Sequence, residues 1–147
     1  MKARPSGGLK TLALLAMLAV AGPLAAKADI LWNWSYLNAE TKITASGTLI
    51  TKDLSAGSYA ITAITGLWNG AAITGLEAVH SCCSPPGWND NLLVEGSPKL
   101  DKGGFAFRVS GDLKINLFYK NGGYAYEIQK GPEVFGGVFN ATPSGAH

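Results

Sequence analysis

The chain has 147 residues, a formal net charge of +2 and only two cysteines. This length favours one domain rather than two. Four of the twelve basic residues, and none of the ten acidic ones, lie in residues 1–28, so the net charge of the remaining chain is about −2. Because that part carries no basic cluster, a nucleic-acid partner is not expected.

Residues 1–28 have the pattern of a secretory signal peptide. Basic residues precede an apolar run at 11–21, and a small-x-small cleavage pattern ends at Ala28. The alternative is a membrane anchor, but an anchor needs about 20 apolar residues and this run is shorter. The sequence therefore predicts cleavage after Ala28 and a secreted or periplasmic protein. No transmembrane segment is expected after cleavage, because no later apolar run is long enough.

Residues 29–142 are patterned as a β domain of short strands between turns. In Trp32–Tyr36 aromatic side chains alternate with polar ones, so the aromatic rings share one face of a strand, and we expect that face to lie in a core. Asn121-Gly122 is typical of a tight hairpin turn. Strands are expected at 31–37, 42–51, 58–65, 72–79, 91–95, 105–109, 113–120, 124–128 and 133–140.

About eight to nine short strands predict a single all-β domain, either an antiparallel β-sandwich or a small β-barrel. The pattern does not decide between these two architectures. The similar segments 61–67 and 73–76 are interpreted as neighbouring strands of a hairpin. Residues 80–98 are rich in Pro and Gly and are expected to be mostly loop. Residues 143–147 are expected to form a disordered tail.

His80, Cys82 and Cys83 stand together in this loop, and the two cysteines are adjacent. Exported proteins meet oxidising surroundings that favour disulfides. Neighbouring Cα atoms lie only ~3.8 Å apart, below the usual disulfide spacing of about 4.4–6.8 Å, so a local bond would close a strained ring. Three interpretations stay open: a disulfide or an idle thiol pair, a soft-metal site of His80, Cys82 and Cys83, and a redox-active pair. The only other histidine, His147, lies in the tail.

Trp88, Asn89, Asp90 and Asn91 form a candidate ligand loop. Binding residues concentrate in such loops, and the Trp88 indole could stack on a sugar ring. The oxygen-bearing side chains that follow it would suit Ca²⁺, although the spacing lacks the pattern of an EF-hand. Asn and Asp are also ordinary turn residues.

An enzyme is not expected. Only His80 is placed to act in a Ser-His-Asp arrangement, and the chain has no Gly-x-Ser-x-Gly elbow and no phosphate-binding loop. Asp90, Asp101 and Asp112 are separated acids that are interpreted as solvated turn residues. No cofactor is predicted.

Several short segments stand in a recognisable order along the chain. They are Trp32–Tyr36, 45–48, 57–66, 69–70, 73–76, 89–92, 100–101, 104–107 and 139–143. In this order they resemble exported bacterial proteins of the PEP-CTERM-associated type, although the PEP-CTERM sorting tail is lacking. The resemblance implies export in a bacterium, to the envelope or an extracellular matrix, and it brings no catalytic residues.

The sequence thus predicts an exported, non-catalytic β domain with a binding or structural role in the bacterial envelope or extracellular matrix. An extracellular glycan or another matrix component is the expected partner. The alternative is a small-ligand or soft-metal-binding protein that uses the His80–Cys83 loop. The oligomeric state stays open.

Overall fold

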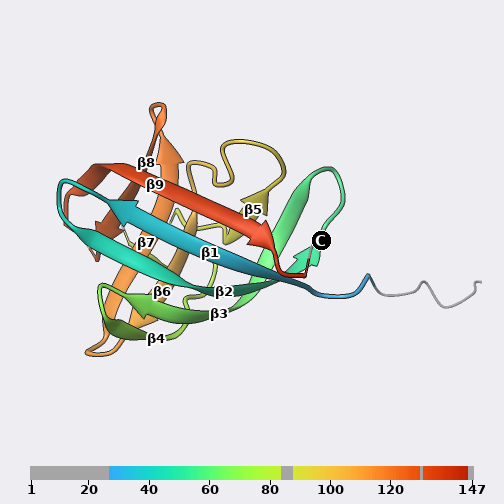
Figure 1. The fold of residues 1–147 in the computed structure, drawn as a ribbon, viewed down its shortest axis with the longest axis horizontal. Helices are drawn as coiled ribbons and strands as arrows, with labels where there is room; N and C mark the ends of the chain where they lie inside the picture. Colours follow the sequence, from blue (N-terminus) through green and yellow to red (C-terminus); the bar gives the residue numbers. More distant parts are fainter. Residues whose placement is uncertain (1–26, 84–87, 130, 146–147) are drawn as a thin grey trace, which may run out of the picture.

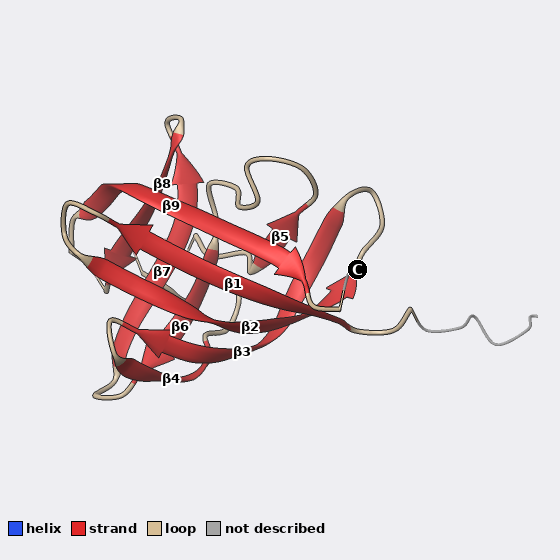
Figure 2. Cartoon of the chain, viewed as in Figure 1, coloured by secondary structure: helices blue, strands red, loops and turns tan. Residues whose placement is uncertain are grey.

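Antiparallel strands make up the regular structure of the chain (Figure 1). The computed structural model describes residues 27–83, 88–129 and 131–145, and these residues contain no helix (Figure 2). None of them therefore forms a helix with the length and apolar character that crossing a membrane requires. The strands are β1 (Ile30–Asn38), β2 (Ile43–Asp53), β3 (Ser58–Trp68), β4 (Ala71–Leu76), β5 (Leu92–Val94), β6 (Phe105–Val109), β7 (Leu113–Lys120), β8 (Gly123–Ile128) and β9 (Glu133–Pro143).

Eight of the strands close a ring in the order β1-β2-β3-β4-β6-β7-β8-β9, and pairing of β9 with β1 completes it. β5 pairs with β3 and lies outside the ring. The predicted all-β fold is confirmed, and of the two architectures left open the structure shows the barrel. The predicted hairpin is the β3–β4 pair, in which Leu67 faces Ala72 and Trp68 faces Ala71.

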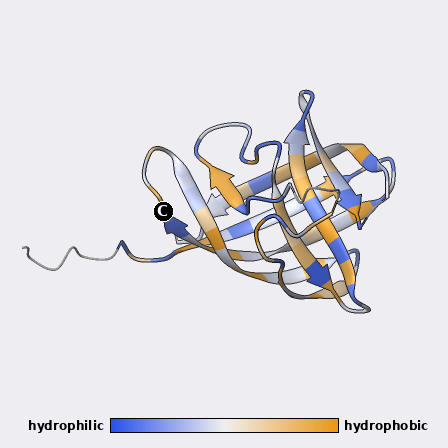
Figure 3. Cartoon of the chain, turned by 180° about the vertical axis from the view of Figure 1, so that it is seen from behind, coloured by the Kyte–Doolittle hydropathy of each residue, from blue (hydrophilic) through white to orange (hydrophobic). Residues whose placement is uncertain are grey.

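The barrel interior is filled by the aromatic face of β1. Trp32, Trp34 and Tyr36 are all buried, as their spacing predicts. The Trp34 ring lies within 6.2 Å, between ring centroids, of Phe105, Phe107 and Phe139. Each such side chain contributes roughly 1.5–3 kcal/mol through burial. Figure 3 shows the resulting alternation of hydrophobic and hydrophilic residues along the strands.

The ends of the described chain are tied to the barrel. Pro143 is the last residue of β9 and pairs with Trp32, and the Ser144 amide donates to the Leu31 carbonyl (2.7 Å). Pro143 and Ser144, which the prediction placed in the tail, are therefore held against β1. Lys27 forms an ion pair with Asp53 (2.9 Å). Residues 1–26, which make up most of the predicted signal peptide, fall outside the described residues, and so does His147.

The outer face of β6, β7 and β8 is buried, unlike that of β1, where Leu31 and Leu37 are exposed. The described parts of the segment 77–104, which are residues 77–83 and 88–104, cover it, and we call them the covering segment. Asn91 Oδ1 accepts from the Ala106 amide, and Asn116 Nδ2 donates to a carbonyl of the same covering segment. Polar Lys114 and Asn116 alternate with apolar residues along β7, which is typical of a strand with one side in water, but the covering segment lies on that side. The outward residues buried in this way are Ala106, Asn116, Phe118, Ala125 and Glu127.

Candidate functional site

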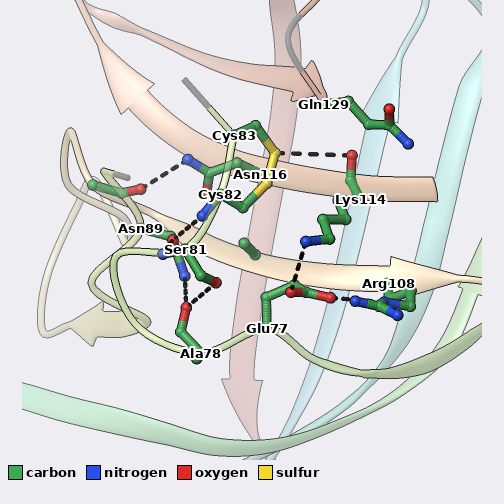
Figure 4. The surroundings of a disulfide bond; sticks show 12 residues. Glu77, Ala78, Ser81, Cys82, Cys83, Asn89, Arg108, Lys114, Asn116 and Gln129 are labelled. Carbon is green, nitrogen blue, oxygen red and sulfur yellow. Dashed lines mark hydrogen bonds and ion pairs between the residues drawn. A yellow bond between two sulfur atoms is a disulfide. The ribbon is translucent and has the colours of Figure 1, made fainter. Parts of the chain in front are cut away.

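Asn89 holds the covering segment in shape from a fully buried position, at 0% exposure. Its Oδ1 accepts from the backbone amides of Ser81 (3.0 Å) and Cys82 (2.9 Å). Its Nδ2 donates to the Ala78 carbonyl (2.9 Å) and to Asn91 Oδ1 (3.0 Å). The predicted ligand residue Asn89 therefore points inward and organises the backbone of the cysteine loop (Figure 4).

Asn91 extends the same network. Its backbone is in the left-handed region, with φ of 54°, which asparagine tolerates better than most residues. Its Oδ1 also accepts from the Ala106 amide (3.1 Å), and its Nδ2 donates to the Glu77 carbonyl (2.8 Å). Both asparagines thus serve as a scaffold, while Trp88, next to Asn89, remains 52% exposed.

Cys82 and Cys83 are joined by a disulfide, across a peptide bond that is cis. The Cys83 sulfur lies 3.8 Å from the Lys114 carbonyl oxygen on β7 (Figure 4). A hollow of about 350 Å³, which we call the disulfide hollow, opens here. Its lining residues are Ser81, Cys82, Cys83, Lys114 and Gln129.

The disulfide leaves neither sulfur as the thiolate that a soft metal requires. His80 is exposed, and its backbone amide donates to the Asn89 carbonyl (2.7 Å). In the described part of the chain, no three His, Cys, Asp or Glu side chains form a group that could hold a metal ion. A soft-metal site of His80, Cys82 and Cys83 stays a prediction for the reduced chain.

A second hollow of about 170 Å³ lies beneath the exposed indole, and we call it the Trp88 hollow. Lys120 and Glu133 form an ion pair across one wall, at 2.8 Å between Nζ and Oε1. The walls thus carry both charges together with aromatic surface. The lining residues are Trp88, Lys102, Asn116, Phe118, Lys120, Glu127 and Glu133.

One residue of this lining has a buried acceptor without a partner. Asn116 is 2% exposed, and its Nδ2 donates to the Gly103 carbonyl (3.1 Å), but its Oδ1 has no hydrogen-bond partner. A carbonyl can only accept, so this bond fixes which end of the amide is the oxygen. Among the described residues the other such buried atom is Trp34 Nε1, which lies among aromatic rings in the core. A buried acceptor left unpaired costs about 1–3 kcal/mol.

Asp90 and Asp101 are brought together, contrary to the expectation that they are separate solvated residues. The two carboxyl groups are near neighbours, and Asp101 Oδ1 accepts from the amides of Gly103 and Gly104 (3.0 Å each). Burial, with Asp101 as neighbour, raises the pKa of Asp90 from 3.8 to about 7. These two neighbouring carboxyl groups bring the ligand loop next to the segment that leads into β6.

This pair predicts a pH dependence of stability. The folded state holds the Asp90 proton up to about pH 7, whereas the unfolded state releases it near pH 3.8. The stability that this proton contributes is therefore complete below about pH 4 and is lost as the pH rises to 7. The shift corresponds to about 4 kcal/mol, which partial exposure reduces to about 1–2 kcal/mol. Asp90→Asn should therefore be the more stable protein at pH 8 and nearly equal to the parent at pH 4. Denaturant unfolding across this range checks it, and parallel pH curves for the two proteins would refute it.

No family model, curated protein or solved structure matches the chain. The site is therefore interpreted from its own geometry. Of the predicted site residues, Trp88 faces solvent above a hollow, Asn89 and Asn91 are buried supports, and Asp90 is paired with Asp101. The sequence does not predict Asn116 as a site residue. A signal was present, because Phe118 lies on the same outward side of β7, and a large apolar ring there indicates that this side is covered.

Proposed function

We propose that the chain is an exported, non-catalytic domain that binds an extracellular glycan in the Trp88 hollow. The observation that carries this proposal is a hollow lined both by the half-exposed Trp88 indole and by Asn116, whose buried Oδ1 has no hydrogen-bond partner. A sugar supplies what the hollow lacks, since its hydroxyl or amide groups donate hydrogen bonds and its ring has an apolar face that packs on an aromatic side chain.

The charges on the walls favour a neutral ligand. Lys120 is paired with Glu133, and Lys102 and Glu127 add one charge of each sign. A strongly charged ligand would therefore meet like charge as well as opposite charge. The volume of about 170 Å³ is below the roughly 300–1,000 Å³ of pockets that enclose a whole drug-sized ligand. It suits one unit of a longer chain.

Export and location in the envelope or matrix are part of the proposal, and the signal-peptide pattern of residues 1–28 supports them. The proposal assigns no reaction, because the paired Asp90 and Asp101 are tied to each other and to loop amides rather than lining the Trp88 hollow. Turnover of a bound glycan by the pure protein would overturn the non-catalytic part.

Trp88→Ala is expected to weaken glycan binding by about 30-fold, because truncation of a central tryptophan typically costs about 2 kcal/mol or more. The free energy of unfolding should hardly change, since the indole is half exposed. Isothermal titration with neutral cello- and chito-oligosaccharides measures the effect.

Leu54→Ala is the matched control, because Leu54 is equally exposed at 53% and lies in neither hollow. It should bind as the parent does. Asn116→Leu should abolish binding, because it removes the unpaired Oδ1 from the lining. It should also lower the free energy of unfolding by about 1–3 kcal/mol, since the Gly103 carbonyl loses its donor. Equal loss in the Leu54 variant, or no binding by the parent protein, would refute the proposed function.

A further inference from the structure

The outer face of β9, β1, β2 and β3 lies on the side of the barrel away from the covering segment. Figure 1 shows β9, β1 and β2 side by side on it, and β2 stands opposite β7 in the eight-strand ring. Its outward side chains carry no charge, and Lys42 and Lys52 stand beyond them at the two ends of β2. The centre of a protein interface is typically depleted in charged residues, so this composition suits a docking surface. We call it the uncharged face, and its members are Leu31, Asn33, Ser35, Leu37, Thr44, Ser46, Thr48, Ile50, Thr65, Leu67, Val138, Asn140 and Thr142.

One row of side chains crosses the uncharged face from β9 to β2. Leu37 on β1 lies opposite Val138 on β9 and opposite Thr44 on β2. Cross-strand partners share one face of a sheet, and neighbouring strands are about 4.8 Å apart, so Val138 and Thr44 lie about 10 Å apart on either side of Leu37. Val138 is 56% exposed and Leu37 is 48% exposed, so this end of the row projects as an apolar ridge.

A third hollow, of about 250 Å³, adjoins the other end of the row, and we call it the Leu67 hollow. Thr44 belongs both to the row and to this hollow, and the half-exposed Leu67 stands beside it on β3. Its lining residues are Thr44, Ala45, Ser46, Leu67 and Gly70. None of them is charged, so an apolar side chain can enter this hollow without stripping water from a charge.

The ridge and the hollow are arranged so that the uncharged face is complementary to itself. Val138 lies on one side of Leu37 and the Leu67 hollow on the other. A two-fold axis parallel to β1 and passing beside Leu37 therefore brings Val138 of each copy against the Leu67 hollow of the other. Two-fold dimers use one patch in this reciprocal way, and facing sheets pack with their strands about 30° apart. Because the face is uncharged, no like charges meet across it.

We propose that two copies of this chain associate through the uncharged face as a symmetric dimer, with Val138 of each copy seated in the Leu67 hollow of the other. This inference goes beyond the proposed function and does not rest on it. A standard interface buries about 800 Å² per partner with 20–30 residues, so the thirteen residues of this face correspond to roughly 450 Å² per copy and about 900 Å² in all. An interface of this size is typical of a weak, reversible dimer. Since β7 lies opposite β2, the two Trp88 hollows face away from the interface.

Sedimentation velocity of the purified protein between about 0.01 and 1 mM tests the dimer, and half of the chains should be dimeric near about 0.1 mM. Val138→Lys places a charge against an uncharged hollow twice in each dimer, so it should weaken association by at least about 100-fold and leave monomer throughout this range. Leu54→Lys is the matched control, because Leu54 is 53% exposed and lies beyond the end of β2, outside the uncharged face. It should dimerise as the parent does, and both variants should keep the parent melting temperature.

Cross-linking tests the position of the two-fold axis. Leu37→Cys should be joined into a covalent dimer by a short bis-maleimide, because Leu37 faces Leu37 of the partner subunit across the axis. The two native cysteines form a disulfide and offer no competing thiol. Leu54→Cys should stay uncoupled under the same conditions. A parent protein that is monomeric at about 1 mM, equal weakening by the two lysine substitutions, or equal cross-linking of the two cysteine variants would overturn the inference.

Discussion

Replacing Asn89 by alanine is expected to lower the free energy of unfolding by about 4 kcal/mol. The substitution removes four hydrogen bonds and leaves the amides of Ser81 and Cys82, the Ala78 carbonyl and Asn91 Oδ1 without this partner. Each buried group left unsatisfied costs about 1–3 kcal/mol, and water entering the loop recovers part of the total. The melting temperature should fall by about 15 °C. Guanidinium unfolding followed by tryptophan fluorescence measures the loss.

Asn89→Asp is the informative control for this prediction. It keeps the acceptor for the two backbone amides but cannot donate to Ala78 or Asn91 when ionised, so its loss should lie between those of the parent and the alanine variant. A loss below about 1 kcal/mol for Asn89→Ala would contradict the scaffold role of this residue.

Replacing Gly47 by alanine is expected to cost more than about 3 kcal/mol or to prevent folding. β2 and β3 approach closely where Gly47 faces Gly66, and a methyl group on Gly47 would fall on the Thr65 carbonyl oxygen and 2.6 Å from the Gly66 Cα. Because the obstacle is backbone, no side-chain rotation relieves it. The yield of folded protein and its unfolding midpoint measure the effect.

Gly75→Ala supplies the comparison, since its β4 position has no atom within 4 Å of the added methyl group and no positive φ. Its stability should change by less than about 1 kcal/mol, because alanine mainly restricts the unfolded chain. Equal stability of the Gly47 and Gly75 variants would show that β2 and β3 can separate there without cost.

The strands were predictable because their determinants are local. The period-two pattern identified the buried face of β1, and Asn69-Gly70 and Asn121-Gly122 adopt the positive φ angles expected of their turns. Closure of the barrel was not predictable in the same way. It depends on the pairing of β1 with β9 from opposite ends of the domain, and on the close approach of β2 and β3 at their glycines.

The candidate site was predictable only in part. Trp88 stood out by its place in a Pro- and Gly-rich loop, and it is exposed. The side-chain amides of Asn89 and Asn91 turn inward, because backbone groups there offer them hydrogen-bond partners. Asn116 looked like one more polar residue on an outward row, and only the fold of segment 77–104 over β7 makes its oxygen a buried, unpaired acceptor.

NMR titration of ¹⁵N-labelled protein with chito-oligosaccharides tests most directly whether a neutral glycan binds in the hollow that Trp88 and Asn116 line. The Trp88 indole signal and the Asn116 side-chain amide signals should shift together and saturate at the same ligand concentration. The indole of Trp34, buried in the barrel, should stay in place. Saturable shifts confined to another face, with the Trp88 and Asn116 signals unmoved, would contradict glycan binding in the Trp88 hollow.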